Sequence, residues 1–312
     1  MPLPPPARDL ALRRATALPF ADLKRAAAAL SALYRDRAPR LSGLSPELRV
    51  AAYLVTRMPA TYAAAAAVLS EVRARTAAPI ASVLDIGAGT GAASLAARAA
   101  FPLARLTLCE PDPAFAQAAR ELLPEALWQP SDFTSPAPFP AHDLVVAAYS
   151  LGEVPTPAAL EAALRMWEAA RVALAIVQPG TPAGFSLVRQ VRDRLLTAGA
   201  HMLAPCPSSA ACPMRDPDWC HFSARTDRSS LHRRLKDAAL GYEDEKFSYI
   251  AFSRTPVPLA PARILRHPLH RPGLITFELC EAPRVVSISI PHSDRLLFRA
   301  ARRASWGASW PS

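Results

Sequence analysis

Residues 82–91, S-V-L-D-I-G-A-G-T-G, decide the fold of this chain, because they join a short apolar strand to a glycine-rich turn. Gly87, Gly89 and Gly91 let the backbone approach a ligand closely, where a side chain would clash. A dinucleotide site would show Gly-x-Gly-x-x-Gly, with a pyrophosphate at the helix N-terminus. Here Asp85 precedes the first glycine, a form typical of S-adenosylmethionine sites, since that ligand has an ammonium group and no phosphate. An NAD-binding fold with an unusual turn is the alternative.

Short apolar runs alternate with helical patterns on both sides of this turn. The runs are 82–86, 105–109, 143–148 and 172–177, and the helical patterns between and after them are 92–100, 113–122, 157–169 and 185–198. This alternation predicts an α/β fold with a doubly wound, Rossmann-like parallel sheet, the class I S-adenosylmethionine-dependent methyltransferase fold. Further apolar runs at 247–253, 274–280 and 285–290 are expected to be strands that close the core.

Two acidic residues follow the next strands at positions suited to the same cofactor. Glu110 comes at the end of the second strand, where a carboxylate can accept hydrogen bonds from both ribose hydroxyls. Asp132 and Phe133 follow a third expected strand, where the acid can bind the adenine amine and the ring can pack on adenine. Together with Asp85 and the three glycines, these residues predict an S-adenosylmethionine pocket.

The catalytic residue cannot be assigned from the sequence. The fourth strand leads into residues 149–153, Y-S-L-G-E, which differ from the Asn/Asp-Pro-Pro-aromatic turn that presents an exocyclic amine for methylation. Neither the fourth nor the fifth strand ends in a cysteine, so a nucleophile for attack on a pyrimidine ring is missing. Tyr149 and Glu153 are the only candidates at the pocket rim.

Four of the five cysteines lie beyond residue 200, at Cys206, Cys212, Cys220 and Cys280. Thiolates this close together in a reducing compartment are stable when a metal or cluster holds them. The spacing Cys-x5-Cys-x7-Cys differs from the Cys-x2-Cys pairs of zinc fingers, so an iron–sulfur cluster with four cysteine ligands is favoured over zinc. Buried free thiols without a metal are the third possibility.

The N-terminal region, residues 1–78, is expected to be helical. Ser45 should cap a helix that starts at Pro46, and Pro59 should break or kink the helical pattern that contains it. This region carries a net charge of +7, residues 79–200 carry −3, and residues 201–312 carry +6. Basic flanks around a slightly acidic centre indicate a polyanionic partner.

Five segments are expected along the chain. They are an N-terminal helical region (1–78), a Rossmann-like core (79–200), a cysteine-rich insertion (201–246), closing strands of the core (247–292) and a basic tail (293–312). The absence of an uninterrupted apolar window of about 18 residues and of a signal peptide predicts a protein without a membrane partner. We expect a cytoplasmic monomer.

The chain resembles the methyltransferase-like small-ribosomal-subunit assembly factors of mitochondria and bacteria. The resemblance rests on five stretches: R-M-P-A-T-Y at 57–62, the turn at 85–91, Q-P-G-T at 178–181, the cysteine stretch 206–222 and F-S-Y at 247–249. It implies a [4Fe-4S] cluster on Cys206, Cys212, Cys220 and Cys280, and association with small-subunit ribosomal RNA in the pre-ribosomal small subunit. An active rRNA methyltransferase is the alternative function, and a small-molecule methyltransferase is favoured less.

Two basic stretches are candidates for RNA contact. Residues 225–236 include several arginines and His232, and form either a solvated helix face or a phosphate-binding surface. The tail beyond Ser293 holds four arginines and two tryptophans, which suit phosphate neutralisation and stacking on unpaired bases if the tail is not disordered.

Overall fold

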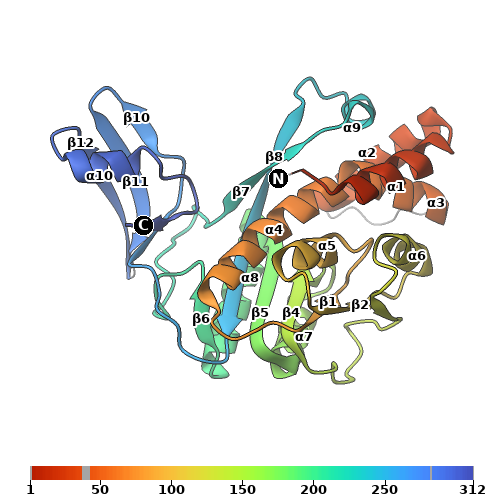
Figure 1. The fold of residues 1–312 in the computed structure, drawn as a ribbon, viewed down its shortest axis with the longest axis horizontal. Helices are drawn as coiled ribbons and strands as arrows, with labels where there is room; N and C mark the ends of the chain where they lie inside the picture. Colours follow the sequence, from red (N-terminus) through yellow and green to blue (C-terminus); the bar gives the residue numbers. More distant parts are fainter. Residues whose placement is uncertain (1, 37–42, 282, 312) are drawn as a thin grey trace. The chain divides into compact units, whose positions relative to one another are not determined.

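The chain forms two compact units in the computed structural model, which describes residues 2–36, 43–281 and 283–311. The first unit comprises Met1–Leu69, Ala81–Ser135 and Ala224–Glu245. The second comprises Ser70–Ile80, Pro136–Ser223 and Lys246–Ser312. Three elements, which are labelled in Figure 1, contribute residues to both units: α4 (Met58–Arg75), β7 (Phe222–Asp227) and β8 (Tyr242–Ser253).

Three helices at the start of the first unit pack against one another: α1 (Pro5–Thr16), α2 (Phe20–Asp36) and α3 (Pro46–Thr56) (Figure 1). The Ser45 side chain accepts a hydrogen bond from the Leu48 backbone amide at 3.3 Å, which confirms the predicted cap of α3. The helical pattern is interrupted between Thr56 and Met58, one residue before Pro59. Proline is tolerated in the first turn of α4, where its missing N–H has no intrahelical partner to lose.

The first unit also holds parallel strands in the order β3-β2-β1. Their bounds are β1 (Ser82–Ile86), β2 (Arg105–Cys109) and β3 (Leu127–Gln129), with α5 (Ala92–Ala100) and α6 (Pro113–Leu122) as the connecting helices. Helix α5 packs on β1 and β2. A hairpin of β7 (Phe222–Asp227) and β8 encloses the short helix α9 (Ser230–Leu235).

The second unit contains a mixed sheet in the order β4-β5-β8-β6. Strands β4 (His142–Ala148) and β5 (Ala170–Pro179) are parallel, whereas β8 runs antiparallel to both β5 and β6 (His201–Ala204). The 3-10 turn η1 (Leu151–Glu153) and α7 (Thr156–Ala169) connect β4 to β5, and α8 (Pro182–Thr197) packs on β5 and α7. Strand β5 is almost entirely buried, as expected for a central strand.

A second sheet in this unit corrects the prediction that residues 274–280 and 285–290 close the core. These runs are strands β11 (Leu274–Glu281) and β12 (Arg284–Pro291), but they pair with each other. Strand β11 also pairs with β9 (Ala262–Ile264) and β10 (Leu269–Arg271), and β9 pairs with β13 (Ser309–Trp310) (Figure 1). Of the predicted closing strands, only β8 joins the sheet of β4 and β5.

The basic tail is folded, contrary to the expectation that it could be disordered. It forms α10 (Arg295–Ala301), which packs on β11 and β12, and then β13. Trp310 is 5% exposed, and its ring centroid lies 4.7 Å from that of Phe277 in an edge-on contact. The indole of Trp310 is therefore part of a core and is not available for stacking on a base.

The arrangement of strands confirms the predicted α/β class. Parallel β3-β2-β1 and parallel β4-β5 followed by antiparallel β8 are typical of class I S-adenosylmethionine-dependent methyltransferases. The five segment boundaries given above stay predictions. Within the described part of the chain, every helix is too short or too polar to cross a bilayer.

Candidate functional site

The turn after β1 requires glycine at three positions. The φ angles of Gly87, Gly89 and Gly91 are +67°, +56° and +84°, in the left-handed region that L side chains rarely adopt. The backbone amides of Gly87 and Ala88 donate to the Cys109 carbonyl at 2.9 and 3.0 Å, so the turn is fastened to β2. A Cβ at Gly89 would meet only the Phe115 ring, at 3.9 Å, which leaves this side of the turn open to a ligand.

Asp85 has an unsatisfied acceptor beside this turn. The carboxylate is 1% exposed, and its Oδ2 accepts a hydrogen bond from the Ser94 hydroxyl at 2.6 Å. Its Oδ1 is buried without a hydrogen-bond partner among the described residues. Burial raises the pKa of Asp85 to about 6, and the bond from Ser94 opposes that rise. A buried carboxylate with an unused oxygen is suited to a ligand that brings a cation or a hydrogen-bond donor.

Glu110 connects the glycine turn to the β2–α6 loop. Its Oε2 accepts from the Gly89 amide and its Oε1 from the Asp112 amide, both at 2.8 Å. Burial raises the pKa of Glu110, while these two backbone bonds oppose the rise. The Glu110 carboxylate thus already accepts two backbone hydrogen bonds. Each of its oxygens retains a second lone pair, which could accept a hydrogen bond from a ribose hydroxyl as predicted.

Asp132 and Phe133 lie in the loop that follows β3. Asp132 is exposed, and its Oδ1 accepts from the Thr134 amide at 2.8 Å, which stabilises a local turn. Phe133 is 8% exposed. All seven residues predicted to bind the cofactor therefore lie in the first unit.

Tyr149 and Glu153, the predicted rim candidates, lie in the second unit at the end of β4. Tyr149 is 7% exposed and has a φ of +66°, and its amide donates to the Val177 carbonyl at 2.8 Å. Glu153 ends the turn η1. Both residues have further interactions within the protein, so neither stands out as a catalytic base.

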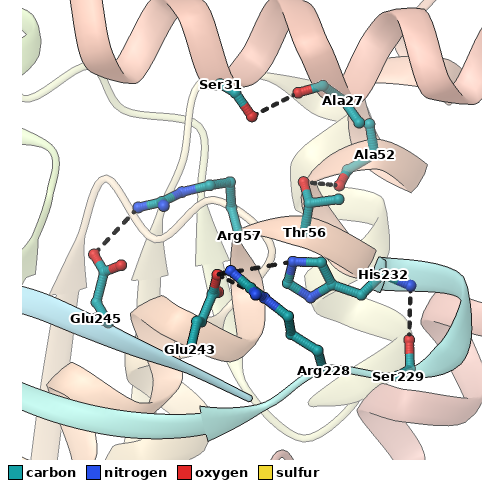
Figure 2. Close-up of polar contacts among 10 residues, drawn as sticks. All are labelled: Ala27, Ser31, Ala52, Thr56, Arg57, Arg228, Ser229, His232, Glu243 and Glu245. Atoms are coloured by element: carbon teal, nitrogen blue, oxygen red, sulfur yellow. Dashed lines mark hydrogen bonds and ion pairs between the residues drawn. The ribbon is translucent and has the colours of Figure 1, made fainter. Parts of the chain in front are cut away.

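The stretch at 57–62 begins with a half-buried ion pair in the first unit (Figure 2). Arg57 Nη2 lies 3.3 Å from Glu245 Oε1. Close by, Arg228 donates through Nε and Nη2 to Glu243 Oε2, at 3.2 and 2.8 Å. His232 points toward the same carboxylate, with Nε2 at 4.0 Å from Oε2 (Figure 2). This group of side chains links the α3–α4 junction to the β7–β8 hairpin.

The basic run 225–236 is therefore only partly a solvated surface. Arg228 is occupied by Glu243, and His232 is 1% exposed. Arg225 is exposed but binds Asp244 through two parallel hydrogen bonds of 2.8 and 2.9 Å. Arg233 and Arg234 are the exposed arginines of α9, and they are the members of the run that remain suited to phosphate contact.

All four predicted metal ligands line a single cavity in the second unit. Cys206, Cys212 and Cys220 come from the coil between β6 and β7, and Cys280 comes from β11. All are free thiols. The rest of the lining is largely apolar and includes Phe185, Met214, Leu265 and Tyr249.

Burial raises the pKa of three of these thiols. For Cys280, burial together with the neighbouring Cys206 and Cys212 raises the pKa to about 12. The pKa of Cys220 is raised well above its usual range by burial and by the other three thiols. For Cys206, burial raises the pKa while the Arg192 guanidinium lowers it. A metal that binds here must therefore displace protons.

The donor chemistry, four free thiols that line one cavity, fits a thiolate-bound metal group. Within residues 2–36, 43–281 and 283–311, no three Cys, His, Asp or Glu side chains are arranged to hold a metal ion. His221, the neighbour of Cys220, does not line the cavity. Its ring stacks on Trp219 with 5.1 Å between centroids, so a role as a fifth candidate ligand is not supported.

Two buried arginines of the cavity were missed by sequence reasoning. Arg192 and Arg263 line the cavity and are 4% and 2% exposed. The signal for Arg192 was present, because it lies on the apolar stripe of α8 formed by Val188, Val191 and Leu195. Arg263 belongs to a three-residue strand, which is too short for a pattern to identify a buried charge.

Comparison with known proteins gives a family match over most of the chain. A family model described as mitochondrial small ribosomal subunit Rsm22 matches residues 47–311. The human mitochondrial ribosome assembly protein METTL17 is 28% identical over 289 residues, covering 83% of this chain and 62% of METTL17. The mitochondrial Rsm22-cox11 tandem protein 2 of Schizosaccharomyces pombe is 24% identical, covering 90% of this chain and 45% of that protein. This chain thus spans less than two thirds of either relative.

Among solved structures, the magnesium protoporphyrin IX methyltransferase of Synechocystis PCC 6803 with bound S-adenosylmethionine is similar, with a TM-score of 0.41 and 13% identity. The match covers 73% of this chain and 91% of that chain.

The prediction of a cytoplasmic location is wrong. The matching family and both relatives carry mitochondrial names. The prediction rested on the absence of a signal peptide and of a long apolar window, and neither of these determines the compartment.

Proposed function

Because this chain belongs to the family of the mitochondrial small ribosomal subunit protein Rsm22, we propose that it assists assembly of the small ribosomal subunit by binding its RNA. METTL17, a relative, is named a ribosome assembly protein. The net charge of +10, concentrated in the flanks of the chain, supports a partner rich in phosphate. The protein would do so as a monomer without a membrane partner.

S-adenosylmethionine is the cofactor proposed for the first unit. Asp85 Oδ1 would accept a donor from the ligand, the glycine turn would lie against it, and Glu110 would bind the ribose hydroxyls. Asp132 and Phe133 would bind the adenine. The support is the unpaired buried acceptor of Asp85 and the open side of Gly89. When bound, this cofactor supplies an activated methyl group.

A [4Fe-4S] cluster held by Cys206, Cys212, Cys220 and Cys280 is proposed for the second unit. The observation that carries this proposal is the meeting of four free thiols from separate segments in one cavity. The spacing Cys-x5-Cys-x7-Cys, unlike the Cys-x2-Cys pairs of zinc fingers, favours the cluster over a single zinc ion. A cluster offers each thiolate its own iron and electron-transfer chemistry.

Metal analysis of two serine variants tests this ligand assignment. Anaerobically purified protein should be brown and contain iron and acid-labile sulfide in equal amounts. Cys212→Ser should lose the iron and become less stable, because the ligand bonds connect the coil to β11. Cys109→Ser is the matched control, since Cys109 is a buried thiol of β2 outside the cavity. Stoichiometric zinc without iron in the wild-type protein would refute the cluster.

Crosslinking of the protein to RNA in cells, followed by sequencing, tests the assembly role. The expected result is enrichment of small-subunit ribosomal RNA. A methylation map of a strain without the gene separates the alternatives: a lost methyl group on that RNA would establish an rRNA methyltransferase. Enrichment without a lost methyl group supports a binding role, and absence of both would favour the small-molecule methyltransferase.

A further inference from the structure

The charged side chains in the lining of the cysteine cavity are all positive. Three of its lining residues are arginines, Arg189, Arg192 and Arg263, and none of those described carries a carboxylate. Arg263 Nη1 lies 3.1 Å from Glu71 Oε2, an oxygen that Arg75 Nε also contacts at 3.1 Å, so this one carboxylate serves two guanidiniums. Arg192 pairs with Asp193 at 2.7 Å, but the Asp193 side chain is 58% exposed. A buried guanidinium whose carboxylate partner lies in solvent remains able to stabilise a further anion nearby.

Arg192 also fixes the loop that spaces the first two thiols. Its Nη2 donates to the carbonyl oxygen of Ser208 at 3.2 Å and to that of Ala210. Both carbonyls lie between Cys206 and Cys212, in a coil that has no helix or strand hydrogen bonds of its own. A single planar guanidinium on α8 thus holds the middle of the loop.

Other side chains donate hydrogen bonds to backbone carbonyls next to Cys206 and at Cys220. Arg263 Nε donates to the Pro205 carbonyl at 2.9 Å, immediately before Cys206. The Ser248 hydroxyl donates to the Cys220 carbonyl at 2.8 Å. The backbone around the thiols is therefore organised by the protein itself, which lowers the entropy that a bound group would have to overcome.

We propose that Arg192 is a positioning residue of the cysteine cavity, which holds the Cys206–Cys212 loop and supplies a buried positive charge opposite the thiolate-bound group. The charge role rests on the proposed function, because it requires a metal group on the cysteines. The loop role does not. A cation close to a metal–thiolate group favours its reduced, more negative state, so removal of the charge should make the reduction potential more negative.

Two variants of Arg192 separate the two roles. Arg192→Met removes both the charge and the hydrogen bonds, whereas Arg192→Lys retains the charge and loses the planar fork. Arg194→Met is the matched control: Arg194 lies on the same helix, is 52% exposed and makes a loose contact of 3.7 Å with Glu161. Limited proteolysis of the metal-free protein, with cleavage sites mapped within residues 207–213, reports the loop, and a redox titration of the iron-loaded protein reports the charge.

Both Arg192 variants should be cleaved in this loop at least about 10-fold faster than wild type, because losing charged hydrogen bonds to the Ser208 and Ala210 carbonyls raises the population of the open loop. Only Arg192→Met should lower the reduction potential, and Arg194→Met should change neither quantity. If Arg192→Met does not fold, Arg192→Lys decides the loop role. Arg192→Gln, which also removes the charge, then replaces Arg192→Met in the redox titration.

Unchanged cleavage rates within residues 207–213 of the Arg192 variants would overturn the loop role, and an unchanged potential on removal of the charge would overturn the charge role. A wild-type protein that takes up no iron refutes the proposed cluster and, with it, the charge role. The proteolysis experiment still decides whether Arg192 positions the loop, so the two failures are distinguishable.

Discussion

Replacing His232 with leucine should remove an acid-sensitive step from the stability of the protein. His232 is 1% exposed, and neither ring nitrogen has a hydrogen-bond partner among the described residues. Burial lowers its pKa from 6.5 to about 4. Glu243 opposes this shift, and the nearby cations Lys236, Arg228 and Arg57 add to it.

The sign of the effect follows from the lowered pKa. Between about pH 6.5 and pH 4 the unfolded chain binds a proton at His232 that the folded protein excludes, so the free energy of unfolding falls as the pH falls. A shift from 6.5 to about 4, at 1.36 kcal/mol per pKa unit, corresponds to roughly 3 kcal/mol below pH 4. At pH 5 the loss is already about 2 kcal/mol.

Urea denaturation of wild type and His232→Leu at several pH values measures this loss. Near pH 7 the two proteins should differ little, or leucine should be the more stable, because it leaves no unpaired buried nitrogen. The difference in favour of leucine should then grow by about 2 kcal/mol by pH 5. Asp85, whose pKa is raised to about 6, acts in the opposite direction in the same range, so only the difference between the two proteins isolates His232. A difference that does not vary with pH would refute the reasoning.

Two further predictions concern the cofactor turn and the C-terminal arginines. Gly89→Ala should weaken S-adenosylmethionine binding in calorimetry, whereas Gly199→Ala should not, although it introduces a side chain at a similar left-handed φ of +82° in open space. Equal affinities for all three proteins would contradict the assigned turn. Changing the four exposed arginines of the C-terminal segment to glutamine should weaken RNA binding and flatten its dependence on salt, because each neutralised phosphate releases counterions. These are Arg295, Arg299, Arg302 and Arg303. Deleting the whole segment is a poorer test, since it also removes the buried Trp310; a salt slope unchanged by the four substitutions would exclude them from the RNA contact.

Local elements were predictable where the controlling interactions are local. The predicted bounds of β1, α5, β2 and α6 agree with the structure, because each apolar run ends at a turn or cap signal within a few residues. The break before Pro59 follows from the chemistry of a single residue.

Sheet membership and the pairing of buried charges were not predictable from local pattern. Strands β11 and β12 were recognised as strands, but their apolar residues are compatible with any sheet that offers a partner. The contact of Arg57 with Glu245 and the bonds of Arg192 to the cysteine loop join segments that are distant in the sequence. An alternating pattern contains no information on such partners.

The cysteine cavity also imposes an order on synthesis. A chain made from its N-terminus presents Cys206, Cys212 and Cys220 in a coil well before Cys280 leaves the ribosome. The fourth thiol reaches the cavity only when β11 has paired with β9, and the Pro205 carbonyl is held only when Arg263 of β9 is in place. Uptake of the proposed four-thiolate group would therefore be a late event, since it requires that β9 and β11 of the C-terminal sheet have already paired.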